Sequence, residues 1–184
     1  MPVFSPTSVD QLIDLLSEHP NASLLAGGTD FMVEVNLHGR QPQTVINLRR
    51  VEELHEWSYR HTQQTVTIGS AVPYSVMETG KIAELIPALA QAARTVGSPQ
   101  IRAAGTLGGN LGTCSPAGDS LPVLSALNAV IHLIGPQGTR DVPWEEFMLG
   151  VKKNALGSGE FVHSITVPVI QGWQGYAKVG TRNA

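Results

Sequence analysis

The stretch LAGGTD, Leu25 to Asp30, directly follows a short apolar run and places two glycines, a hydroxyl and a carboxylate in succession. Glycine allows positive φ and lets another group approach the backbone closely. Two glycines between a strand and a helical segment can turn several backbone N–H groups toward one point, where they attract an anion such as a phosphate. The alternative is that the pair forms only a tight turn.

A second stretch, TLGGN at residues 106–110, repeats this arrangement. It lies within residues 97–119, a segment rich in Gly, Pro and Ser that we expect to be structureless, and such long segments inside compact domains are usually functional. Neither a GxxxxGK[ST] motif nor a GxGxxG motif after the first strand is present, which disfavours nucleotide hydrolysis and a Rossmann-type dinucleotide site. The two loops therefore favour a phosphate-bearing ligand that is held without being hydrolysed, such as a diphosphate between two lobes.

The residues around the first loop predict a strand, a glycine turn, a helical segment and a second strand. A capping pattern at residues 7–10 opens a first helix with an apolar stripe, and Pro20 ends it. Strands are expected at 23–26 and 44–48, with an apolar helix or irregular turn at 31–37 between them. This βαβ-like order favours a small parallel sheet.

The pattern of residue types changes near residue 57. We expect strands at 65–70, 129–134 and 161–167, a turn at 135–138, helical segments at 72–80, 82–96 and 121–127, and the start of another strand at 175–179. The predicted fold class is α+β, with an α/β-like lobe over residues 1–56 and a larger α+β lobe over residues 57–184. No linker is rich enough in Pro, Gly or charge to make the lobes independent domains.

Composition excludes several classes of protein. No apolar run approaches the roughly 20 residues that cross a bilayer, and residues 1–6 lack the blocks of a signal peptide, so we expect no membrane contact and a cytoplasmic location. A net charge of −3 argues against nucleic-acid binding. The single cysteine, Cys114, excludes an iron–sulfur cluster held by this chain's thiolates alone, and the histidine spacing predicts no metal site.

Four stretches occur in the order and approximate spacing of one known family: LLAGGTD, QIRAAGTLGGNLGTCSPAGDS, GEFVHSITVP and YAKVGTRNA. Over essentially its whole length the chain resembles the FAD-binding (medium) subunits of molybdenum hydroxylases, such as those of bacterial xanthine dehydrogenase, carbon monoxide dehydrogenase and nicotine dehydrogenase. The resemblance implies the two-lobed FAD-binding fold of the PCMH or vanillyl-alcohol-oxidase type, with FAD between the lobes. Because family members carry a further C-terminal domain, it also implies that this chain is truncated or a reduced member.

The resemblance further implies cofactor contacts at particular positions. The FAD pyrophosphate would be lined from the first lobe by Ala26, Gly27, Gly28, Thr29 and Asp30, and from the second by Thr106, Gly109, Asn110, Ser115 and Pro116. Asp119 would accept hydrogen bonds from ribityl or ribose hydroxyls, and Val162 would touch the flavin or adenine ring. Lys178 would reach the pyrimidine carbonyl edge of the isoalloxazine, where a cation stabilises anionic reduced flavin.

For some of these residues a simpler structural role is the alternative. The alternative for Lys178 is a surface lysine on an edge strand, and the alternative for Asp119 is a helix N-cap. Cys114 is interpreted as a small packing residue near the cofactor, because no second cysteine or histidine lies near it in the sequence to make a redox thiol. His132 and His163 lie in apolar strand-like runs and are interpreted as structural.

No set of residues for acid–base chemistry on an organic substrate stands out, so no catalytic residue is predicted. By the resemblance, a molybdopterin-binding large subunit hydroxylates the substrate and a small subunit relays electrons through 2Fe–2S clusters. The FAD subunit collects the electrons and passes them to NAD⁺ or another acceptor. Two other classes stay open: a self-sufficient flavin reductase or oxidase resembling UDP-N-acetylenolpyruvoylglucosamine reductase, and a non-catalytic nucleotide-binding module.

Overall fold

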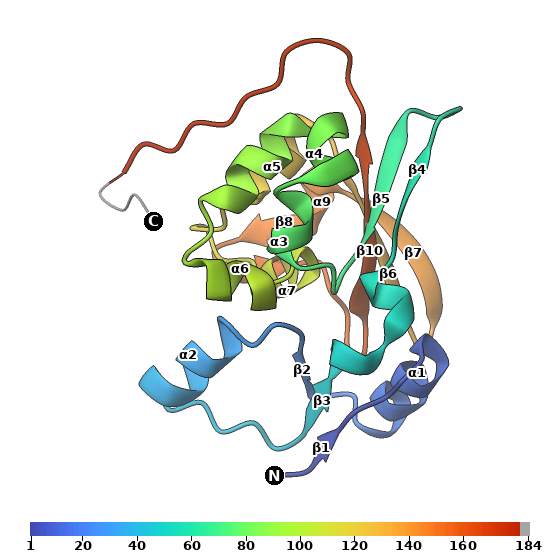
Figure 1. Ribbon diagram of the computed structural model, residues 1–184. Coiled ribbons are helices and arrows are strands. Elements are labelled where there is room, and N and C mark those ends of the chain that lie inside the picture. The colour runs from blue at the N-terminus through green and yellow to red at the C-terminus, as the bar shows by residue number, and fades with distance from the viewer. Residues whose placement is uncertain (181–184) are drawn as a thin grey trace.

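The first glycine loop follows an edge strand of a small parallel sheet (Figure 1). The structure is a computed structural model that describes residues 1–180. The strands of this sheet are β1 (Val3–Phe4), β2 (Ser23–Leu25) and β3 (Val45–Asn47), in the order β1-β3-β2 with parallel pairing throughout. Helices α1 (Val9–Glu18) and α2 (Phe31–Leu37) connect successive strands, and the side chain of Ser8 caps α1. The predicted strand–turn–helix–strand unit and its parallel sheet are therefore confirmed, whereas the two residues of β1 were too few to be predicted.

An antiparallel sheet of five strands forms the second part of the fold. Its strands are β4 (Trp57–Arg60), β5 (Thr65–Gly69), β6 (Val130–Gly135), β7 (Gly138–Pro143) and β10 (Phe161–Pro168), in the order β4-β5-β10-β6-β7. The predicted turn between β6 and β7 is present. A register shift between Val162 and Ser164 interrupts the pairing of β10 with β6.

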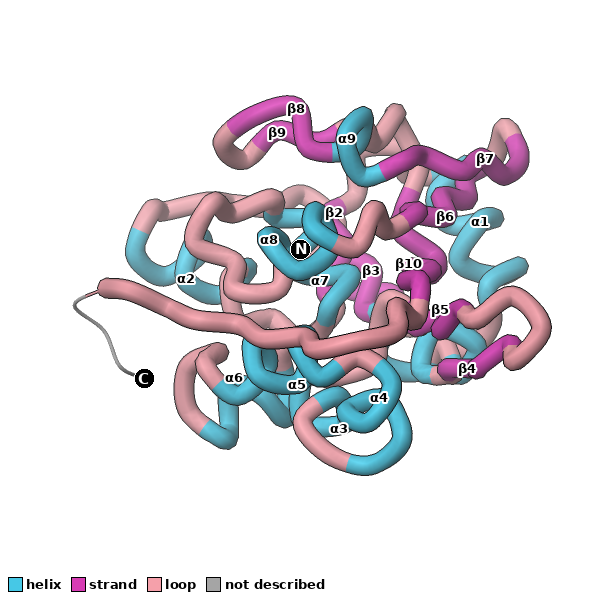
Figure 2. Tube along the Cα trace, turned by 90° about the horizontal axis from the view of Figure 1, so that it is seen from above, coloured by secondary structure: helices cyan, strands magenta, loops and turns pink. Residues whose placement is uncertain are grey.

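Short helices cover one face of the five-stranded sheet (Figures 1 and 2). They are α3 (Tyr74–Met77), α4 (Gly80–Leu85), α5 (Pro87–Arg94), α6 (Pro99–Ala104), α7 (Leu107–Thr113), α8 (Leu121–Ala126) and α9 (Trp144–Phe147). Two 3₁₀ turns, Leu48–Arg50 and Glu52–His55, lead into β4, and a small hairpin of β8 (Met148–Gly150) and β9 (Lys153–Asn154) follows α9. None of the helices in the described part of the chain is long and apolar enough to cross a membrane.

Apolar side chains pack in two clusters. The larger lies between the helices and the five-stranded sheet and includes Ile68, Leu89 and Ile165, all fully buried. The smaller surrounds Leu12 of α1 but also takes in Phe161 of β10. Packing is therefore continuous from the parallel sheet to the antiparallel one, and the division of the chain after residue 56 stays a prediction.

Three expectations about elements are wrong. Residues 97–119 are not structureless, because Ser98 caps α6 and Thr106 caps α7 within that segment. The helical segment predicted at 82–96 is two helices, because Pro87 cannot donate a backbone hydrogen bond and starts α5 anew. The helical segment expected at 72–80 is reduced to α3 before α4 begins.

The chain after β10 forms no strand at 175–179, where one was predicted to start. It leaves the sheet and runs back across the helical layer past α5 (Figures 1 and 2). The backbone N–H of Tyr176 donates to the side chain of Gln91 in α5 at 2.9 Å. We call residues 169–180 the tail; the last four residues of the YAKVGTRNA stretch lie outside the described residues.

Candidate functional site

The two glycine loops meet backbone to backbone at Gly27. A Cβ atom built on Gly27 would collide with the carbonyl group of Ala104 and lie 2.9 Å from the Cα of Gly105. Only glycine allows this approach, because every other residue would force the two loops apart. Gly28 adopts a positive φ of 75°, which turns the chain from β2 into α2. The first glycine pair is therefore more than a tight turn, because it forms half of an interface between the two loops.

A cleft of about 750 Å³ opens beside this contact. Its walls come from both glycine loops, from residues 115–119 and from the tail. Every predicted contact residue except Val162 lines it: Ala26, Gly27, Gly28, Thr29, Asp30, Thr106, Gly109, Asn110, Ser115, Pro116, Asp119 and Lys178. The structure therefore gathers into one cleft residues that are spread over 153 positions of the sequence, from 26 to 178.

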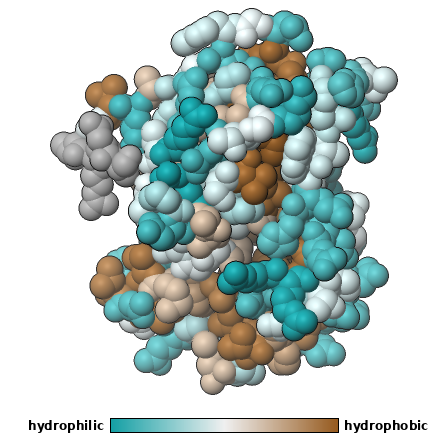
Figure 3. All heavy atoms as spheres, viewed as in Figure 1, coloured by the Kyte–Doolittle hydropathy of each residue, from teal (hydrophilic) through white to brown (hydrophobic). Residues whose placement is uncertain are grey.

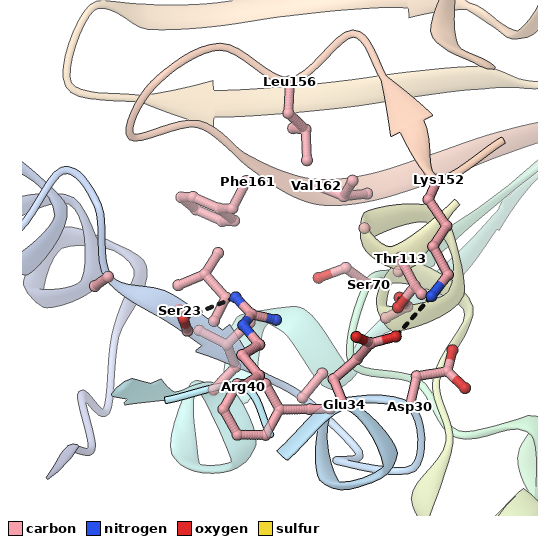
Figure 4. Close-up of a pocket in the computed structure, with 18 residues that line it drawn as sticks. Ser23, Asp30, Glu34, Arg40, Ser70, Thr113, Lys152, Leu156, Phe161 and Val162 are labelled. Atoms are coloured by element: carbon pink, nitrogen blue, oxygen red, sulfur yellow. Dashed lines mark hydrogen bonds and ion pairs between the residues drawn. The ribbon is translucent and has the colours of Figure 1, made fainter. Parts of the chain in front are cut away.

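A smaller hollow of about 450 Å³ adjoins the cleft, and both share Ala26, Asp30 and Gly109 in their walls. We call the larger space the main cleft and the smaller one the side hollow. Val162, which is buried, belongs to the side hollow. Leu156, Phe161 and Val162 face it from one side, and charged side chains of α2 and its following loop face it from the other (Figure 4).

Charged residues that the sequence analysis missed surround the side hollow. They are Glu34, Arg40 and Lys152 (Figure 4). Arg40 donates to the hydroxyl of Ser23 at 3.0 Å and lies over the ring of Phe31, 5.4 Å from its centroid. The Lys152 ammonium lies 2.6 Å from a carboxylate oxygen of Glu34 and holds the pKa of that carboxyl below its ordinary value. No local motif marked these residues, because they meet only in the folded chain.

The hydroxyl of Ser70 is buried and has no hydrogen-bond partner within the described residues. Ser70 directly follows β5 and lines the side hollow, as Gly108 and Thr113 do. Its side chain lies near that of Thr113 in Figure 4. Its backbone is fully used, since its N–H donates to the carbonyl of His163 and its carbonyl accepts from the N–H of Gly108, both at 2.9 Å. An orphaned buried hydroxyl is uncommon, and a ligand in the hollow would satisfy it.

A chain of hydrogen bonds fixes Asn110 in the wall of the main cleft. The Oδ1 atom of Asn110 accepts from the hydroxyl of Ser120 at 3.1 Å, and Ser120 is 3.1 Å from the hydroxyl of Tyr74. Burial raises the pKa of Tyr74 far above its ordinary value, so its hydroxyl stays protonated and donates to Ser120. At the start of α7 the hydroxyl of Thr106 accepts from the N–H of Gly109 at 3.0 Å. Both features give the second loop a defined shape.

Asp119 and the tail meet at the far end of the main cleft. One carboxylate oxygen of Asp119 accepts from the hydroxyl of Tyr176 at 3.1 Å, and the Lys178 ammonium lies 2.9 Å from the carboxylate. The N-cap of α8 is Ser120, so the alternative role of Asp119 as a helix cap is wrong. Of the alternative for Lys178, the edge strand is wrong, because the tail forms no strand, whereas the residue is exposed. Tyr176 opens the YAKVGTRNA stretch, but the sequence analysis assigned it no contact.

Cys114 and the two histidines lie outside both spaces. Cys114 is 1% exposed, and burial raises the pKa of its thiol, which fits the interpretation as a packing residue. His132 and His163 lie on β6 and β10, where His132 bonds to Asp141 and Thr166. Among residues 1–180, no group of three or more His, Cys, Asp or Glu side chains is placed to hold a metal ion.

Residues 1–170 match the family model described as the FAD binding domain in molybdopterin dehydrogenase. The nicotinate dehydrogenase FAD-subunit of Eubacterium barkeri is 33% identical over 170 residues, which are 89% of this chain and 57% of that protein. The carbon monoxide dehydrogenase medium chain of Hydrogenophaga pseudoflava is 33% identical over 175 residues, 94% of this chain and 60% of that one. The chain thus spans about three fifths of the length of these relatives.

Solved structures agree with these relatives. Carbon monoxide dehydrogenase from Hydrogenophaga pseudoflava superposes with a TM-score of 0.92 at 31% identity, covering 100% of this chain and 64% of that one. Quinoline 2-oxidoreductase from Pseudomonas putida 86 gives a TM-score of 0.88 at 25% identity, covering 93% of this chain and 60% of that one. The predicted α+β fold class is confirmed.

Proposed function

Because this chain belongs to the FAD-binding domains of molybdopterin dehydrogenases, we propose that it holds the flavin through which such an enzyme passes electrons onward. The observation that carries the proposal is the contact of two glycine loops at the rim of one cleft lined by nearly every expected FAD contact. The named relatives are dehydrogenase subunits. Membership of this family argues against the two alternatives, a self-sufficient reductase and a non-catalytic nucleotide-binding module.

The shape and chemistry of the site fit FAD. FAD is a long molecule with an adenosine at one end, a flavin at the other and a diphosphate between them. The main cleft and the side hollow together offer two spaces that share the wall formed by Ala26 and Gly109. Main-chain N–H groups at glycine turns suit the diphosphate, because they can approach its oxygens without steric hindrance from side chains.

Each expected contact receives a role on this basis. We assign the diphosphate to the two loops, through Ala26, Gly27, Gly28, Thr29 and Asp30 on one side and Thr106, Gly109, Asn110, Ser115 and Pro116 on the other. Val162 lines the side hollow with Phe31, so we assign the adenine to that hollow and the flavin to the main cleft. The buried hydroxyl of Ser70 is free to bond to the adenosine half.

The protein's own part in the reaction is to bind and orient. Bound FAD supplies reversible two-electron chemistry. Asp119 accepts hydrogen bonds from ribityl hydroxyls, and Lys178 offers a positive charge to the pyrimidine edge of the flavin. The Asp119 carboxylate orients that ammonium and offsets part of its positive potential, because the two groups lie 2.9 Å apart. No side chain is assigned to acid–base catalysis on an organic substrate.

The electrons enter from partner subunits in this proposal. Cys114 is the only cysteine in the sequence, so the cysteine ligands of 2Fe–2S clusters would have to lie outside it. We propose a small 2Fe–2S subunit and a large molybdopterin-binding subunit as partners, and NAD⁺ or another acceptor as the destination of the electrons. A cytoplasmic location stays a prediction that fractionation of the source cells tests.

Flavin analysis of the purified full chain tests the proposal. We expect visible flavin absorbance with about one FAD per chain, either as purified or after titration with FAD. Copurification from the native source should also recover subunits that contain molybdenum and iron. Anaerobic addition of NADH to the FAD-loaded protein then tests the acceptor, because bleaching of the flavin is expected if NAD⁺ serves. A colourless protein that takes up no FAD would refute the proposal.

A further inference from the structure

One ion pair joins helix α2, which follows the first glycine loop, to the β8–β9 hairpin, which is fixed near the second glycine loop. Lys152, at the tip of the β8–β9 hairpin, lies 2.6 Å from Glu34 of α2 (Figure 4). The two residues are 118 positions apart in the sequence. Of the ion pairs within residues 1–180, this is the one that links residues 1–56 to the rest of the described chain.

The hairpin is fixed to the C-terminal end of α7. The N–H of Lys152 donates to the carbonyl of Cys114 at 2.9 Å. The side-chain amide of Asn154 donates to the carbonyls of Leu111 and Gly112 at 3.1 and 3.0 Å. These bonds occupy carbonyl groups that α7 itself leaves unpaired at its end. Because α7 starts in the second glycine loop, the position of Lys152 is tied to that loop.

Helix α2, by contrast, is held by few contacts. It starts directly after Asp30 of the first glycine loop, and none of its residues is buried. Met32, Val33 and Leu37 are among the exposed large hydrophobic residues, and Figure 3 shows apolar surface gathered where α2 lies. Core packing therefore does little to place this helix. Its side-chain contact with the β8–β9 hairpin runs through Glu34.

We propose that Glu34 and Lys152 form a clasp that positions α2, and with it the first glycine loop, against the second loop around bound FAD. The proposal rests on the proposed function, because FAD is the ligand it retains. Both residues line the side hollow, so an open clasp would open the wall of that hollow. The Lys152 side chain is 53% exposed, and exposed pairs add little to global stability. The clasp should therefore slow FAD release without strengthening the fold.

Charge-altering variants of the full chain test the clasp through the rate of FAD release. We expect Lys152→Met and Glu34→Gln each to release FAD about twofold to fivefold faster than the wild type, as expected for an exposed or half-exposed ion pair. In a His38→Gln background, which removes the imidazole that lies 3.2 Å from Glu34, the double variant Glu34→Lys with Lys152→Glu should restore slow release, since it reverses the charges and keeps their attraction. The melting temperature of the FAD-free protein should stay the same in all variants.

Lys81→Met is the matched control, because it removes the exposed pair between Lys81 and Glu84 on α4, whose residues line neither space. It should release FAD at the wild-type rate. Single variants that release FAD like the wild type would overturn the clasp, and so would a double variant that does not recover.

Hydrogen exchange of the FAD-free chain keeps the test independent of the proposed function. In Lys152→Met, the amides of α2 should exchange faster while those of α7 do not change. A wild type that binds no FAD refutes the proposed function and leaves this second measurement to decide whether the clasp holds α2. Unchanged exchange in α2 would overturn the clasp in either case.

Discussion

Gly27 is the residue on which the contact between the two loops depends most directly. We expect Gly27→Ala to destabilise the protein by about 1–3 kcal/mol, the usual cost of forcing extra atoms into a packed contact. The reason is that the new methyl group would meet the carbonyl of Ala104 and the Cα of Gly105, neither of which is a flexible side-chain end. Denaturant unfolding measures the change in stability, and titration with FAD measures the expected loss of affinity.

Gly112→Ala provides the matched control in α7, because a Cβ on Gly112 would find no neighbour within 4 Å. It should be neutral or stabilising by up to about 1 kcal/mol, since alanine favours a helix over glycine. Gly112 lines the side hollow, so this variant is a control for stability alone. A Gly27→Ala protein as stable as the wild type, with unchanged FAD affinity, would show that the loops are free to separate.

Removing the hydroxyl of Ser70 should affect FAD affinity without weakening the FAD-free protein. We expect Ser70→Ala to leave the FAD-free protein as stable as the wild type, or to stabilise it by about 1 kcal/mol, because its buried hydroxyl has no partner to lose. FAD affinity should fall by about threefold to tenfold if that hydroxyl bonds to the adenosine half, the usual worth of one hydrogen bond. Thermal unfolding and FAD titration provide the two measurements.

Ser125→Ala, at an exposed position of α8, is the control for this substitution and should change neither quantity. A loss of stability in Ser70→Ala without any change in FAD affinity would contradict the assignment of Ser70 to the ligand.

Burial of His163 in β10 makes the stability of the protein dependent on pH. His163 lies between Val162 and Ser164, where the register with β6 shifts. Burial is the main cause that lowers the pKa of His163 below its ordinary value of 6.5; nearby His132 lowers it further, while Glu53 opposes both. Near pH 6.5 the unfolded chain therefore binds a proton at His163, whereas the folded chain does not. Stability falls as the pH drops below that value, because proton binding favours the unfolded chain.

We expect His163→Gln to lose less stability than the wild type between pH 7.5 and 5.5, because glutamine does not titrate. Denaturant unfolding at several pH values measures this difference. His61→Gln, at an exposed position after β4, controls for replacing a histidine by glutamine. An identical pH dependence in His163→Gln and the wild type would mean that this imidazole takes up its proton as readily in the folded chain.

Local patterns predicted those elements whose signal is local. The apolar stripe of α1 and the glycine turn after β2 each depend on adjacent residues, and the structure has both. The helices within residues 97–119 were missed because their many glycines are read as turns, although Ser98 and Thr106 supply caps. Strand β7 was missed because five of its six residues are exposed and show no alternation. The candidate site residues were predicted from motifs and the family resemblance, because the cleft that they line forms only when both loops meet.

Residues whose contacts lie far away in the sequence were not predicted, for a physical reason. Glu34, Arg40 and Lys152 surround the side hollow, but each is an ordinary surface residue in its own segment. Their placement depends on where the hairpin attaches to α7, which local propensity does not determine. Tyr176 likewise reaches Asp119 because the tail folds back over the helical layer (Figure 2).

At the scale of the whole molecule, two neighbouring spaces share part of their walls at the glycine loops. The main cleft of about 750 Å³ and the side hollow of about 450 Å³ meet at the loops. If the flavin occupies the first and the adenosine the second, each half of FAD should bind on its own, and both halves should bind together. The covalent link makes the second contact intramolecular, with an effective concentration on the order of millimolar.

Calorimetric titration of the full chain with FMN, with adenosine and with FAD measures this additivity. We expect FAD to bind about 10²–10⁴ times more tightly than either half, the usual gain from linking two contacts. Adenosine should bind equally well in the presence of saturating FMN, because the two spaces are separate. Ser70→Ala should weaken adenosine and FAD but leave FMN unchanged, since Ser70 lines only the side hollow. FMN that binds as tightly as FAD would mean that the side hollow contributes nothing to the cofactor.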